Sequence, residues 1–117
     1  MITKIYGIKN CNTMKKTFDL FETAGHSYEF IDYKKNAPDE KLLSDFVDKL
    51  GLDTVVNKLG MTFRKLNEEE KRAMDDKKQA IAILKDKSSM IKRPIIQFEN
   101  GELLAGLEEE RILEKLK

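Results

Sequence analysis

The sequence predicts a single α/β domain, and three observations lead to that prediction. Short runs of apolar and β-branched residues, typical of buried strands, occur near both ends of the chain. Between and after them, apolar residues recur with helical spacing. The length of 117 residues suits one compact domain that can bury a core without disulfides or metal.

The first third of the chain predicts a strand, a helix and a second strand. The run "ITKIYGI" (2–8) is short and apolar, and we expect a buried strand that stops before Asn10. From Thr13 the period changes to that of a helix, which ends at Gly25. The run "SYEFIDY" (27–33) alternates like a strand. A helical crossover between two strands implies that the strands are parallel.

The middle of the chain is predicted to be helical from Pro38, which fits a first helical turn. An apolar stripe follows and stops at Gly51. Its members are Leu42, Leu43, Phe46, Val47 and Leu50. The run "DTVVNKLG" (53–60) predicts a short helix that ends at Gly60.

The rest of the middle segment predicts a loop and further helix. We expect "MTFRKLN" (61–67) to be a loop. Asn67 with Glu70 three residues later resembles a capping box, and Asp75 or Asp76 fits the start of a helix through "KKQAIAILK". Residues 38–87 are therefore interpreted as a helical insert, not as a separate domain, because the apolar stripe is too narrow for a core of its own.

The end of the chain predicts two strands and a helix. Asn100-Gly101 lies between two apolar runs and indicates a type I′ hairpin. A closing helix is expected over 108–117, with inward side chains Ile112, Leu113 and Leu116. The order β-α-β, helical insert, β-β-α is typical of a thioredoxin-like fold with a mixed four-stranded sheet, here one domain over residues 1–117.

Composition excludes several classes of function. The chain has 22 Lys and Arg against 21 Asp and Glu, which gives no reason to expect DNA or membrane binding. One cysteine and one histidine argue against a disulfide framework and against a metal site. The first ten residues lack the pattern of a signal peptide, and no apolar run is long enough for a membrane span. We expect a soluble, cytoplasmic monomer.

The cysteine, Cys11, is the first candidate for chemistry. It falls where the first strand passes into the first helix, so unpaired backbone N–H groups would point at its sulfur. Lys9 and Lys15 add positive charge nearby, and both effects lower a thiol pKa. The alternative is a buried, inert cysteine. Thr13 is expected to cap the helix, with a hydrogen bond to the thiolate as the alternative.

Pro94 and His26 have contrasting interpretations. Pro94 begins a strand that should be central, where a proline cannot donate to the ladder, so we expect a cis Arg93-Pro94 bond. An ordinary trans proline at the strand start is the alternative. His26 follows the first helix at its far end from Cys11, and we expect a surface or boundary residue, not a general base.

Three motifs, "YGIKNCNTMKK", "TFRKL" and "IKRPII", together resemble the arsenate-reductase-like (ArsC) family, most closely its YffB-type branch, with the regulator Spx as a cousin. The resemblance implies a catalytic Cys11 and basic residues Arg64 and Arg93 that hold an oxyanion or a carboxylate near the sulfur. It implies a cis Pro94 whose neighbouring backbone pairs with an extended thiol ligand. It also implies glutathione as co-substrate, no bound cofactor, and glutaredoxin as a candidate partner.

Two departures from the family pattern bear on the substrate. Arsenate reductases of the family carry a late arginine where Gly106 and Leu107 stand here, and a histidine before the cysteine where Gly7 stands. We therefore favour a glutathione-dependent thiol reductase acting on a disulfide over an enzyme acting on arsenate, the narrower oxyanion alternative.

Two interpretations without turnover are kept beside the enzyme. A Spx-like regulator would bind RNA polymerase, but its redox switch uses a CxxC pair, and "CNTM" cannot form that disulfide. The other is a thioredoxin-like scaffold with no activity, since a fold alone does not assign chemistry.

Overall fold

The computed structural model describes residues 2–117, which divide into two compact units. The first unit comprises the chain up to Asn36 together with Arg93–Lys117, and the second comprises Ala37–Lys92. The predicted insert, residues 38–87, lies within the second unit. Its description as part of one single domain stays a prediction.

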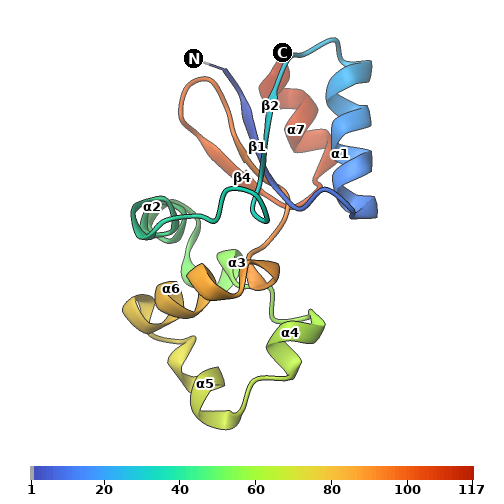
Figure 1. The fold of residues 1–117 in the computed structure, drawn as a ribbon. Helices are drawn as coiled ribbons and strands as arrows, with labels where there is room; N and C mark the ends of the chain where they lie inside the picture. The colour runs from blue at the N-terminus through green and yellow to red at the C-terminus, as the bar shows by residue number, and fades with distance from the viewer. Residues whose placement is uncertain (1) are drawn as a thin grey trace. The chain divides into compact units, whose positions relative to one another are not determined.

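The first unit is built on a mixed four-stranded sheet with the order β2-β1-β3-β4 (Figure 1). The strands are β1 (Lys4–Gly7), β2 (Glu29–Asp32), β3 (Ile95–Gln97) and β4 (Leu103–Ala105). β1 pairs with β2 in parallel, and the β1–β3 and β3–β4 pairs are antiparallel. The predicted fold class, an α/β thioredoxin-like arrangement with a mixed sheet, is confirmed.

Two helices cover one face of this sheet and form its core. The pairings Ile5 with Ile96 and Ile96 with Leu104 put three fully or nearly buried side chains in one row across the sheet. Helices α1 (Asn12–Thr23) and α7 (Glu109–Leu116) pack on this row, and Figure 1 shows them beside each other. They contribute buried side chains that belong to the same cluster: Met14, Phe21 and Ile112.

The closing helix differs in one respect from its prediction. Ile112 is fully buried and Leu116 partly packs against the core, as expected. The inward placement predicted for Leu113 is wrong, because 39% of that residue is exposed. Only one narrow stripe of this eight-residue helix contacts the sheet, and Leu113 lies beside that stripe.

The hairpin between β3 and β4 also differs from its prediction. A type I′ turn needs a left-handed conformation at Asn100, but no residue other than glycine has a positive φ among residues 2–117. Gly101 takes the left-handed conformation at φ 91°, and its N–H donates to the Phe98 carbonyl at 2.9 Å. A turn followed by a left-handed glycine is the pattern of a three-residue hairpin loop, so the predicted turn type is wrong although the hairpin is present.

The regular secondary structure of the second unit is helical, apart from one isolated bridge between Val56 and Ile91. Its helices are α2 (Glu40–Leu50), α3 (Leu52–Val55), α4 (Met61–Arg64), α5 (Glu68–Ala73), α6 (Lys77–Asp86) and the 3₁₀-helix η1 (Ser88–Met90). In the part of the chain that the structure describes, no helix is long and apolar enough to cross a membrane.

Several predicted helix boundaries in this unit are confirmed. Asn67 accepts a hydrogen bond from the Glu70 N–H at 2.7 Å, and the Glu70 side chain accepts one from the Asn67 N–H, which completes the capping box. Asp76 caps α6, and Gly51 ends α2 in a positive-φ conformation. Pro38 is not in the first turn as predicted, because Asp39 is the N-cap residue and accepts from the Leu42 N–H.

Two predictions between α2 and α5 are wrong. The helix predicted to end at Gly60 ends five residues earlier at Val55, and Gly60 instead precedes α4. The predicted loop over 61–67 contains α4, a single turn with no buried residue. One turn is too short to show a helical period. It is held by a contact distant in sequence, in which the Thr62 and Ser89 hydroxyls lie 2.9 Å apart.

Candidate functional site

Cys11 lies at the carboxyl end of β1 and is the N-cap residue of α1, with an extended backbone at φ −142° and ψ 131°. Its carbonyl accepts the first helical hydrogen bond from the Lys15 N–H at 3.0 Å. The side chain is half-buried, and it packs at the edge of the core cluster. The predicted strand-to-helix position is therefore confirmed. The predicted capping role of Thr13 is wrong, because the cap position belongs to Cys11.

The surroundings of Cys11 lower the pKa of its thiol below the ordinary value. Burial acts in the opposite direction and raises it, because a partly desolvated sulfur resists ionisation. Against this act the backbone N–H of Met14, a hydrogen bond from the Arg93 side chain, the N–H of Thr13 and the positive charge of Arg93. Neither N–H makes a full capping hydrogen bond with the sulfur, yet both favour the thiolate.

Arg93 reaches the thiol because of the pairing of β3 with β1. The two strands are antiparallel and Tyr6 pairs with Ile95, so the residues just before β3 lie beside the carboxyl end of β1. The chain passes from β1 into Cys11 at that same end. The Arg93-Pro94 bond is cis, as predicted. The Pro94 carbonyl accepts a hydrogen bond from the Gly106 N–H at 2.8 Å.

Tyr33 is a residue at this site that the sequence interpretation missed. It directly follows β2, its N–H donates to the Gly7 carbonyl at 2.8 Å, and its ring stacks on Tyr6 with centroids 6.4 Å apart. Burial, followed by the nearby Tyr6, raises its pKa far above the ordinary value, while Arg93 partly offsets this. Its hydroxyl therefore stays neutral beside Arg93. The missed signal was topological, because the carboxyl ends of two parallel strands meet at one sheet edge.

The other predicted basic residues are placed differently from Arg93. Lys9 and Lys15 are exposed, and the main charge that acts on the thiol comes from Arg93. Arg64 is exposed at the end of α4, in the second unit. The roles of these three residues toward a substrate stay predictions.

His26 is a boundary residue, as predicted. It lies beyond the end of α1, its ring contacts Phe21 edge-on, and its Nδ1 lies 2.9 Å from the Ser27 carbonyl oxygen.

The two departures from the arsenate reductase pattern have physical causes in this chain. A Cβ added to Gly7 would lie 2.4 Å from Cε and 2.5 Å from Sδ of Met14, which fills the space beside the strand. Gly106 has φ 87°, a conformation that side-chain-bearing residues rarely adopt. A histidine at the first position or an arginine at the second would therefore require the surrounding structure to change.

Comparison with known proteins places the chain in a family. The family model described as the ArsC family matches residues 6–115, nearly the whole chain. The chain belongs to the ArsC family. An uncharacterized protein of Haemophilus influenzae is 37% identical to this chain over 109 residues, and the match covers 93% of each of the two chains.

Solved structures of ArsC-like proteins support the same placement. The structure described as YFFB (PA3664) protein is 36% identical with a TM-score of 0.92, over 98% of this chain and 99% of that chain. An arsenate reductase (ArsC) related protein from Brucella melitensis is 35% identical with a TM-score of 0.76, over 100% of this chain and 96% of that chain. The YffB-type resemblance is thus confirmed, and the chain belongs to a family of thiol reductases.

Proposed function

We propose that this chain is a glutathione-dependent thiol reductase in which Cys11 is the nucleophile. The observation that carries the proposal is the lowered pKa of Cys11, produced by backbone N–H groups of α1 and by the Arg93 side chain. The thiolate is the reactive form of cysteine, so this arrangement increases the reactive fraction at neutral pH. The partial exposure of the side chain leaves the sulfur open to a substrate.

The reaction on a glutathione mixed disulfide needs one protein thiol and one external thiol. The Cys11 thiolate attacks the glutathione sulfur, a new disulfide forms between Cys11 and glutathione, and the substrate leaves as its thiolate. A second glutathione thiolate then attacks the glutathione sulfur of that intermediate. Oxidised glutathione is released and the Cys11 thiolate returns. An external thiol is required because Cys11 is the single cysteine of the chain.

Arg93 supplies a binding function in this proposal. Its guanidinium is permanently charged and presents a planar set of donors, which suits a carboxylate of glutathione or an oxyanion. Because it also hydrogen-bonds the Cys11 sulfur, a group bound by Arg93 would lie close to the nucleophile. The segment beginning at Pro94 adjoins this position and is proposed to contact the glutathione backbone. Arg64 remains the second proposed oxyanion-binding residue.

A disulfide substrate fits this site better than arsenate does. Met14 occupies the space beside Gly7, and the left-handed backbone at Gly106 disfavours an arginine. A single carboxylate of glutathione is matched by the charge of Arg93 alone, whereas the greater charge of arsenate would also need Arg64.

The test is an NADPH-linked assay with glutathione and glutathione reductase, run with and without glutaredoxin. A glutathione mixed disulfide and arsenate are supplied as alternative substrates. We expect turnover of the disulfide, its loss in Cys11→Ser, and a weaker rate in Arg93→Gln. Arg111→Gln, which removes an exposed arginine of α7, is the matched control and should turn over like the native chain.

The outcomes separate the alternatives. Disulfide turnover that persists in Cys11→Ser would overturn the proposal, and turnover of arsenate in preference to the disulfide would assign the narrower activity. An absence of turnover, combined with stoichiometric recovery of RNA polymerase in a pull-down, would instead favour a Spx-like regulator. An absence of both would leave a scaffold.

A further inference from the structure

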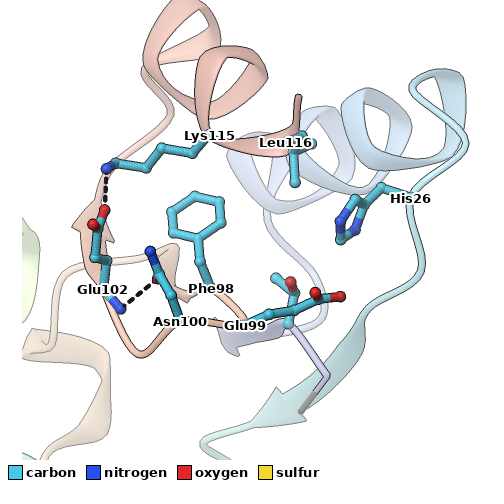
Figure 2. A pocket seen from close by; sticks show the side chains of 8 residues that line it. His26, Phe98, Glu99, Asn100, Glu102, Lys115 and Leu116 are labelled. Atoms are coloured by element: carbon cyan, nitrogen blue, oxygen red, sulfur yellow. Dashed lines mark hydrogen bonds and ion pairs between the residues drawn. The ribbon is translucent and has the colours of Figure 1, made fainter.

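A pocket lies at the end of β1 opposite to Cys11, within the first unit. Its volume is about 390 Å³, within the range of small-molecule sites. Thr3, which precedes β1, lines it together with the β3–β4 hairpin, His26 and the end of α7 (Figure 2). Cys11 follows β1 at the other end, so this pocket is separate from the thiol. We propose that it binds a small organic ammonium ion.

The first observation is a buried hydroxyl that lacks a protein partner. Only 1% of Thr3 is exposed, and within residues 2–117 its Oγ1 has no hydrogen-bond partner. Its backbone carbonyl is already engaged by the Glu29 N–H at 2.9 Å. A buried hydroxyl without a partner costs free energy. Thr3 Oγ1 is closed off from solvent, so the lining must give way before a ligand N–H reaches this atom and removes that cost.

The second observation is the charge of the lining. Lys115 is paired with Glu102, so these two charges compensate each other. Glu99 is exposed, and its side chain makes no ion pair or hydrogen bond among residues 2–117. In Figure 2 its carboxylate points away from the Lys115–Glu102 pair, toward the side where His26 lies. The Lys115–Glu102 pair leaves the carboxylate of Glu99 as the excess charge of the lining, which favours a cation.

The third observation is that the lining accepts both a cation and an alkyl chain. The Lys115 Nζ already lies 5.8 Å from the centroid of the Phe98 ring, a distance at which a cation is attracted by the ring. Leu116 adds apolar surface beside it. A short alkylammonium ion can place its charge at Glu99 and Thr3 and its carbon chain against these side chains. An anion would be repelled by Glu99, and the ammonium group of Lys115 is already paired with Glu102.

The test is an NMR titration of the ¹⁵N-labelled full chain with 1,5-diaminopentane at constant ionic strength. The neutral analogue 1,5-pentanediol is titrated in parallel. We expect saturable shifts at the amides of Thr3, Glu99 and Asn100 with the diamine and none with the diol. Glu99→Gln should raise the dissociation constant by about tenfold or more, because it removes the charge that binds the ammonium.

Two further variants complete the design. Thr3→Val removes the hydroxyl at nearly constant volume and should also weaken diamine binding while leaving the chain folded. Glu109→Gln makes the same charge change on α7, outside the pocket, and should leave the dissociation constant unchanged. The proposal is overturned if saturable binding is absent, if the diol shifts the same amides, or if Glu109→Gln weakens binding as much as Glu99→Gln. Because binding is the measured quantity, none of these results depends on the activity of Cys11.

Discussion

Gly7 and Met14 should be energetically coupled, and a double-mutant cycle can measure the coupling. In Gly7→Ala the new Cβ would lie 2.4 Å from the Met14 terminal methyl, which must move by roughly 1 Å to restore ordinary contact. Met14 is fully buried, so this movement disturbs the core, and overpacking of this kind costs about 1–3 kcal/mol. Met14→Ala leaves a cavity instead and should cost about 2–5 kcal/mol.

In the double variant the methyl group added at position 7 enters space that Met14 has vacated. The loss of stability should therefore be smaller than the sum of the two single losses, by at least about 0.5 kcal/mol and up to about 3 kcal/mol. The measurement is the free energy of unfolding by urea denaturation for the four proteins of the cycle, with the slope checked for constancy.

A control cycle pairs Gly7→Ala with Leu84→Ala. Leu84 is a fully buried residue of α6 in the second unit and is not part of the core cluster that contains Met14, so these two losses should add within about 0.5 kcal/mol. Strict additivity for Gly7 and Met14 would refute the argument that Met14 occupies the space in which a larger residue at position 7 would lie.

Three other perturbations follow from contacts described above. Arg93→Gln should raise the pKa of Cys11, measured as slower alkylation by iodoacetamide at neutral pH; an unchanged pH profile would contradict the role of Arg93. Lys115 lowers the pKa of Glu102, so their pairing stabilises the fold above the ordinary glutamate pKa. This stabilisation is lost as the pH falls through the lowered pKa. Glu102→Gln should therefore flatten that part of the plot of unfolding free energy against pH. Asn67→Ala removes one half of the capping box and should cost about 1 kcal/mol in thermal or urea unfolding, and no measurable loss would contradict its capping role.

The sequence was sufficient where one local pattern determines one local structure. The period change after Asn10 predicts the strand-to-helix junction at Cys11, and Asn67 with Glu70 predicts a capping box, because each depends on a few neighbouring residues. The turn of α4 was missed because one turn shows no period and a contact between Thr62 and η1 holds it. The hairpin type was missed because the Asn-Gly pair also fits a loop one residue longer.

The site was predictable to a similar degree. The motifs identified Cys11 and Arg93, and the pairing of β1 with β3 explains why they meet. Tyr33 was missed because tyrosine after a strand is an ordinary core residue, and its position beside Arg93 depends on the parallel pairing of β1 with β2.

The thiol and the oxyanion requirements of an ArsC-type site are separable in this chain. The elements that lower the Cys11 pKa, namely the start of α1 and Arg93, all belong to the first unit and are determined by strand pairing and helix capping. Two of the three positions that depart from the arsenate reductase pattern are subject to other constraints, the volume of Met14 at Gly7 and the left-handed backbone at Gly106. A chain can therefore keep an activated cysteine while its packing disfavours a histidine at position 7 and its backbone disfavours an arginine at position 106. Such a chain is suited to substrates that bring a sulfur to attack and a single carboxylate to hold, which is why a glutathione disulfide is the substrate class we propose.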